Sequence, residues 1–271
     1  METISSSNLS IYQNSFFMSE PNKNDAQKLY TFLGIVNNLI NQGPKGLKKL
    51  NKIEQLWNGQ LSGSRIDHST RQTIVDLKEL ASKYEFEEAL VSNYIIAKKR
   101  DFSDKKFENF DDLEKYMEGV AESVGLIVAR ILGLKHDADE YVRYQSDAII
   151  YLSFIRNLSE DSEAGRYYFP KSEIRRFGLP YPNLKNASKY PGAYREFIEA
   201  QTRKYNVLQF QAQKGLKFLP YSKRIALHTM IDLNNWEVKK IYTNPFLVFN
   251  GYTKPNRAVV IKSYLVRIIH A

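Results

Sequence analysis

The segment 153–170, SFIRNLSEDSEAGRYYFP, brings together side chains that could bind a metal ion and a diphosphate. Arg156 precedes Glu160 and Asp161, and Arg166 follows five residues after Asp161. Carboxylate oxygens are the ligands that Mg²⁺ prefers, and the guanidinium fork matches phosphate oxygens. The same residues are also typical of a salt bridge at a helix end, so the segment alone leaves both interpretations open.

A second polar group lies in the segment 28–46, KLYTFLGIVNNLINQGPKG, which is otherwise apolar. Asn37, Asn38 and Asn41 share one edge of a predicted helix, with the spacing Asn-Asn-x-x-Asn. An amide oxygen can coordinate a hard cation, but it brings no charge. Asn, Gly and Pro also end helices, so termination of a helix explains the same residues.

Helices must position both groups, because apolar residues recur with the helical period along most of the chain. The 13 Gly and 9 Pro are few and gather between the periodic segments, which favours an all-α fold. With no repeat or linker, we expect a single domain over 1–271, with 1–14 as a flexible N-terminus. The predicted helices cover about 25–40, 47–58, 69–82, 86–98, 111–133, 138–157, 193–215 and 220–243, with a short helix from Ser172, a loop over 179–192 and a last helix in 254–271.

The predicted helix 111–133 carries a stripe of carboxylates at Glu114, Glu118 and Glu122. Residues four apart lie on one helical face, and this face is opposite the apolar one. A metal site and a solvated surface are the two interpretations. The position away from the apolar face favours the solvated surface.

Composition excludes several other chemistries. The chain has no Cys, so it has no disulfide, Cys-ligated zinc or thiol catalysis, and its four His are scattered without an HExxH pair. No apolar run reaches the roughly 18 residues of a membrane span. The net charge of +9 makes anionic partners plausible, but the basic residues form no dense run. We therefore expect a cytoplasmic protein and no nucleic acid partner.

Four motifs, in order, resemble those of the squalene/phytoene synthase family, the head-to-head prenyl diphosphate synthases. SFIRNLSED and GRYYFP, at 153–161 and 165–170, are similar to the family's N-I-L-R-D-x-x-E-D and G-R-x-Y-L-P. YMEGVAESVG at 116–125 is similar to Y-C-Y-x-V-A-G-x-V-G. The remaining matches are SFF at 15–17 with YTFLGIVNNLIN at 30–41, and GLKFLPYSKRIAL at 215–227.

The resemblance implies an all-α isoprenoid-synthase fold, with helices around a central apolar cavity and Mg²⁺ or Mn²⁺ between two aspartate-rich edges. It implies catalytic roles for Tyr116, Arg156, Asp161 and Tyr168, diphosphate binding by Ser15, Phe16, Arg156 and Arg166, and metal binding by Glu160 and Asp161. The family's D-D-x-x-D is Asn37, Asn38 and Asn41 here, and Asn157 replaces another aspartate. The chain therefore departs from the family where the metals would bind.

Two functions remain open. One is a family member that binds prenyl diphosphates or similar lipid chains, with metal-dependent catalysis lost or weakened. The other is an active prenyltransferase of isoprenoid or carotenoid biosynthesis, which condenses two farnesyl or geranylgeranyl diphosphates into squalene or phytoene. Pairing with an active paralogue and peripheral contact with a membrane are further expectations.

Overall fold

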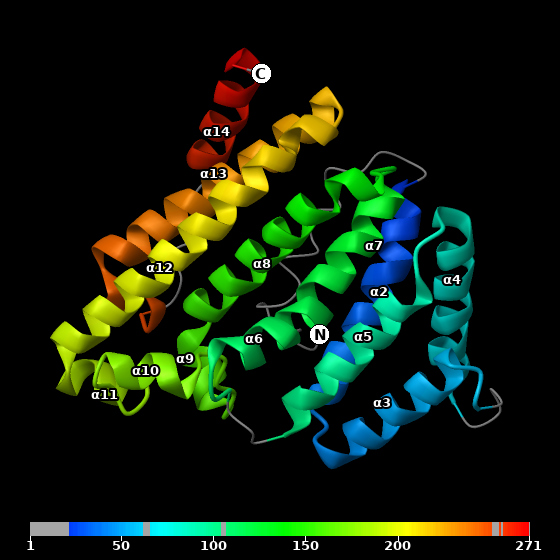
Figure 1. Ribbon diagram of the computed structural model, residues 1–271, viewed down its shortest axis with the longest axis horizontal. Helices are drawn as coiled ribbons and strands as arrows, with labels where there is room; N and C mark the ends of the chain where they lie inside the picture. Colours follow the sequence, from blue (N-terminus) through cyan, green and yellow to red (C-terminus); the bar gives the residue numbers. More distant parts are fainter. Residues whose placement is uncertain (1–21, 62–65, 104–106, 251–254, 256, 271) are drawn as a thin grey trace. The chain divides into compact units, whose positions relative to one another are not determined.

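A computed structural model describes residues 22–61, 66–103, 107–250, 255 and 257–270 (Figure 1). The expected flexible N-terminus at 1–14, and Ser15 and Phe16, lie outside these ranges. The described residues form helices and turns with no strand, which confirms the all-α prediction. None of the described helices is both long and apolar enough to cross a membrane.

The chain divides into two compact units. The first comprises residues 1–105 and 115–143, and the second comprises 106–114 and 144–271. Each is described here by itself. The single domain over 1–271 and the central cavity stay predictions.

The first unit is built on α2 (Asn22–Ile40), α3 (Pro44–Trp57), α4 (His68–Tyr84), α5 (Glu88–Lys99) and α7 (Ser123–Ile131). Leu29, Phe32, Leu33 and Val36 recur at helical spacing on α2 and are buried. They pack with apolar residues of the other four helices into one core. Helix α2 is therefore held by its apolar face, which leaves its polar edge open to other roles.

A wider π-turn, Glu118–Glu122, joins α6 (Phe110–Met117) to α7. It packs on α5 at Gly119, where a Cβ atom would clash with Ala97 and lie 2.9 Å from the backbone oxygen of Asn93. The extra residue in this turn shifts the helical register. Glu118 is exposed as expected, but Glu122 is buried and pairs with Arg143 at 2.5 Å, so the prediction of a solvated stripe is wrong at Glu122.

The second unit holds most of α8 (Asp139–Arg156), α9 (Leu158–Glu163), α10 (Lys171–Arg176), α11 (Leu184–Lys189), α12 (Pro191–Gln213), α13 (Tyr221–Thr243) and α14 (Arg257–His270). The two 23-residue helices α12 and α13 lie side by side, and α14 lies against α13 (Figure 1). Two short 3₁₀ segments, Lys214–Phe218 and Pro245–Val248, follow α12 and α13.

Aromatic rings fill the core of the second unit. Phe169 meets Tyr151 edge to face at 6.2 Å between ring centroids, and it meets Phe197 in the same way at 5.2 Å. Such edge-to-face pairs add to the stabilisation from burial of the rings. The high aromatic content of the sequence is thus used, in part, as packing of this unit.

All the predicted long helices are present, with ends shifted by a few residues and the 111–133 segment interrupted by its π-turn. Two short helices were missed: α9 lies between the predicted helix 138–157 and the short helix from Ser172, and α11 lies in the predicted loop 179–192. Residue 25, where the first predicted helix was expected to begin, is Asp25, and it lies inside α2. Its buried carboxylate accepts hydrogen bonds from Lys83 and Tyr84, both at 2.6 Å.

Candidate functional site

The three amides of the first unit lie where α2 ends. Asn37 is half-buried and Asn38 is exposed, while Asn41 is exposed just beyond the last residue of the helix. The backbone N–H of Gln42 donates to Leu39 at 2.9 Å, and Gly43 has a φ of 56° before Pro44 opens α3. Helix termination, one of the two interpretations of these residues, therefore describes their structure.

The second group lies at the junction of α8 and α9, inside the second unit. Arg156 is the last residue of α8, and Asn157 follows it as a buried residue outside either helix. Asp161 is buried, and its Oδ1 accepts from Nε of Arg166 at 2.9 Å. Glu160 is exposed. The salt bridge at a helix end, which the sequence left open, is thus present between Asp161 and Arg166.

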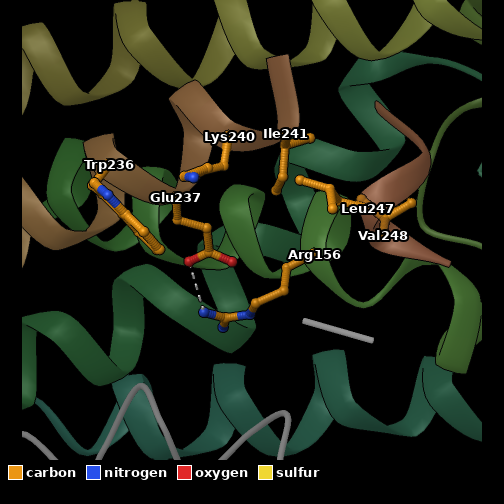
Figure 2. Close-up of a pocket in the computed structure, with 7 residues that line it drawn as sticks. All are labelled: Arg156, Trp236, Glu237, Lys240, Ile241, Leu247 and Val248. Atoms are coloured by element: carbon orange, nitrogen blue, oxygen red, sulfur yellow. Dashed lines mark hydrogen bonds and ion pairs between the residues drawn. The ribbon is translucent and has the colours of Figure 1, made fainter. Parts of the chain in front are cut away.

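Arg156 is engaged in a second ion pair. Its Nη1 lies 3.4 Å from Oε2 of Glu237 on α13, and the side chains are 16% and 3% exposed (Figure 2). Figure 2 shows the guanidinium group pointing at this carboxylate, below Lys240 and beside Trp236. These four residues, with Ile241, Leu247 and Val248, line a small pocket, partly open to solvent, whose free volume of about 10 Å³ is close to that of one water molecule.

Sequence reasoning missed Glu237. It lies 81 residues from Arg156, so no local spacing connects the two. One signal was present in the sequence, because Asp232 and Glu237 are the only acidic residues after position 199. A carboxylate that is buried needs a cationic or hydrogen-bonding partner, and the basic residues around these two could supply one.

The two predicted tyrosines lie in different units. In the first, the Tyr116 hydroxyl donates to Oδ1 of Asp101 at 2.7 Å, and Asp101 forms a nearly fully buried ion pair with Lys98. In the second, the Tyr168 ring stacks on Phe154 with 4.4 Å between centroids. Tyr116 is therefore held by a hydrogen bond, and Tyr168 by ring stacking.

The surroundings of Asp161 are aromatic as well as cationic. The ring of Tyr167 meets that of Tyr181 edge to face at 4.3 Å. Burial, followed by the charges of Asp161 and Tyr167, raises the pKa of Tyr181 far above its usual value of 10.0. The hydroxyl of Tyr181 is thus protonated at neutral pH, as an anion so near Asp161 would be unfavourable.

Few carboxylates are available to bind the metal ions that the resemblance implies. At the end of α2 all three aligned positions hold neutral amides. The α8–α9 junction has two carboxylates. Glu160 is exposed, and Asp161 is buried and paired with Arg166. Within the described ranges, no group of three or more His, Asp or Glu residues could hold a metal ion. Each missing carboxylate removes on the order of several kcal/mol of attraction to a divalent cation at an effective dielectric near 20.

Comparison with solved structures identifies the fold. A dehydrosqualene synthase, crystallised in complex with a ligand, superimposes with a TM-score of 0.78 at 16% identity, over 97% of this chain and 92% of that one. Squalene synthase HpnC from Alicyclobacillus acidocaldarius gives 0.66 at 17% identity, over 92% and 90% of the two chains. These likenesses confirm the predicted isoprenoid-synthase fold.

Sequence comparison finds phytoene synthases. The chain is 26% identical over 170 residues to a chloroplastic phytoene synthase of an Oncidium hybrid cultivar, covering 60% of this chain and 40% of that protein. It is 23% identical over 208 residues to the phytoene synthase of Arthrospira platensis, covering 72% and 67%. The match thus spans about two fifths of the length of the first of these relatives. Residues 5–261 match the family described as Squalene/phytoene synthase, and this chain therefore belongs to the squalene/phytoene synthase family.

Proposed function

We propose that this protein binds a prenyl diphosphate or a similar lipid chain, and that its metal-dependent ionisation of diphosphate is lost or much weakened. The observation that carries the proposal is the pairing of charges at the α8–α9 junction. Arg156 and Arg166, the two arginines expected to bind diphosphate, are each paired with a carboxylate of the same unit. At the four positions where the resemblance implies metal-binding aspartates, 37, 38, 41 and 157, the chain has Asn.

The charge balance explains why such a site would not ionise a substrate. Diphosphate leaves an allylic carbon only when cations neutralise the developing negative charge. Here Glu237 and Asp161 already offset the positive charge of the two arginines. A bound diphosphate must compete with these carboxylates for the two arginines. Less positive charge is then left to neutralise the leaving group, so we expect ligand binding to be kept more readily than bond cleavage.

Retention of a lipid ligand is supported by the family. The solved dehydrosqualene synthase is in complex with a ligand, and the curated relatives are phytoene synthases. The apolar positions of the scaffold are kept, with α2 and α7 contributing a continuous core in the first unit. An inactive copy that pairs with an active paralogue is one use for such a protein.

The alternative is an active prenyltransferase that condenses two farnesyl or geranylgeranyl diphosphates head to head. It is favoured by the retention of Glu160 and Asp161 in the second motif, together with Arg156, Arg166 and Tyr168. In that case Glu160 and Asp161 would bind Mg²⁺ or Mn²⁺. Asp161→Ala would then abolish turnover, whereas an inactive native chain has no turnover to lose.

The test measures diphosphate release from farnesyl and geranylgeranyl diphosphate, with and without Mg²⁺ or Mn²⁺. A parallel variant restores Asp at positions 37, 38, 41 and 157. Binding is followed separately through the fluorescence of Trp236, which lines the pocket beside Arg156, with Trp236→Phe as the control for the signal of buried Trp57. We expect binding without metal-dependent release by the native chain. Sustained release would establish the alternative.

A further inference from the structure

The net positive charge of the protein comes from one part of the chain. Residues 200–271 contain twelve Lys and Arg but two acidic residues, Asp232 and Glu237. Residues 1–199 are close to neutral, with 27 basic and 28 acidic residues. Both acidic residues of the basic segment are used internally, because Asp232 pairs with Arg267 and Glu237 with Arg156. All of this segment belongs to the second unit.

Large apolar side chains are exposed where α12 turns into α13. Val207 and Phe210 near the end of α12 are 61% and 65% exposed, and Tyr221 at the start of α13 is 52% exposed. Exposed Lys214 and Lys217 lie between them, with the Lys214 amine 5.3 Å from the centre of the Phe210 ring. This surface, which we call the α12–α13 corner, thus combines rings, aliphatic side chains and amines.

Helix α14 adds a second exposed apolar face. Its inner side is tied to α13, because Ser263 and Arg267 both bond Asp232, at 3.0 and 2.5 Å. Ile261, which is 58% exposed, and Tyr264, which is 46% exposed, project away from that tie. Helix α14 packs along α13, which begins at the α12–α13 corner.

We propose that the α12–α13 corner and the outer face of α14 dock on a membrane surface that contains anionic lipids. Amines next to exposed rings and aliphatic side chains match the boundary between lipid headgroups and acyl chains, where the charge meets phosphate and the apolar groups enter the hydrocarbon edge. The segment 200–231 lacks any acidic residue that would oppose an anionic surface. Nucleic acid would use the amines but would leave Val207, Phe210 and Ile261 without an apolar environment, so the membrane is favoured.

The experiment measures co-sedimentation of the full chain with vesicles of phosphatidylcholine, with and without phosphatidylglycerol. Phe210→Ser with Ile261→Ser removes exposed apolar groups, and Lys214→Glu with Lys217→Glu reverses exposed charge. The matched controls are Ile96→Ser, also 58% exposed, and Lys48→Glu with Lys52→Glu, exposed on α3. None of these seven substitutions changes Arg156 or Asp161.

We expect binding that needs phosphatidylglycerol, falls at least tenfold in both test variants and changes less than twofold in both controls. Equal losses in test and control variants would overturn the proposal, because only the total charge would then matter. Equal binding to vesicles without phosphatidylglycerol would also overturn it. So would binding to a single-stranded oligonucleotide that the lysine variant abolishes, in a chain that binds no vesicles.

Discussion

The end of α2 and the α8–α9 junction are the two places where the chain departs from the aspartates of its family, and they depart differently. At the end of α2, Asn38 and Asn41 are exposed, and the neighbouring backbone closes the helix in an ordinary turn. At the junction, Asn157 and Asp161 are buried and the surrounding charges are paired. The end of α2 is thus an exposed surface, whereas the α8–α9 junction is a buried polar site whose charges are paired within the protein.

The largest expected effect is at Glu237. Glu237→Ala leaves Arg156, whose side chain is 16% exposed, without this carboxylate, and the loss of one partner of a largely buried ion pair costs about 3 kcal/mol of unfolding free energy. Urea unfolding measures the change, and Glu118→Ala, which removes an exposed carboxylate, is the control with less than about 0.5 kcal/mol. A loss at Glu237 no greater than that of the control would show that the pair contributes nothing.

Glu237→Gln tests the charge balance without removing the side chain. The amide keeps a hydrogen-bond acceptor for Arg156 but removes the negative charge, so the guanidinium becomes available to an anionic ligand. We expect affinity for inorganic diphosphate to rise about tenfold, equivalent to about 1.4 kcal/mol. Isothermal titration of the native chain and the variant measures it, and unchanged affinity would contradict the role given to Glu237.

Restoring single aspartates separates the two edges. Asn157→Asp places a charge in a buried position near Asp161, and we expect it to lower the unfolding free energy by about 1–2 kcal/mol. Asn38→Asp on the exposed end of α2 changes it by less than about 0.5 kcal/mol. Thermal unfolding of both variants compares them directly. If the two variants lose the same stability, the contrast between surface and constrained site fails.

Acid is expected to act on the two units in different pH windows. Burial, then the charges of Arg267 and Arg224, lower the pKa of His228 below 6.5, although Asp232 opposes the shift. The unfolded chain then binds this proton first, so the contribution of His228 to stability is complete above pH 6.5 and falls as the pH drops towards its folded pKa.

Asp25 in the first unit titrates lower. Burial raises its pKa, but hydrogen bonds from Lys83 and Tyr84 and the charges of Lys83 and Lys28 outweigh burial and hold the pKa below 3.8. Its contribution to stability is present above pH 3.8 and is lost as the pH falls through the pKa of the folded state.

The effect at His228 is the smallest one predicted. It is measured by urea unfolding between pH 7.5 and 5.5, where His228→Gln is expected to flatten the dependence; an unchanged slope would remove His228 as its source.

The sequence predicted the long helices well, because an apolar stripe repeated over many turns leaves little choice of conformation. It missed α9 and α11, since six polar-rich residues are too few to display a helical period. At the candidate site, both interpretations of Asp161 were available from spacing; the salt bridge with Arg166 is present, and metal binding stays a prediction. Glu237 was beyond local reasoning, because its pairing with Arg156 depends on how α13 packs against α8.

The most direct test of the account is single-turnover release of diphosphate, with the native chain in excess over farnesyl or geranylgeranyl diphosphate and with Mg²⁺ or Mn²⁺ present. Excess protein reveals even one slow ionisation per site, so low turnover cannot hide activity. We predict that the Trp236 fluorescence reports binding while release stays at the rate of the metal-free control. Metal-dependent release of one diphosphate per site would contradict the account and would identify the chain as a working prenyltransferase.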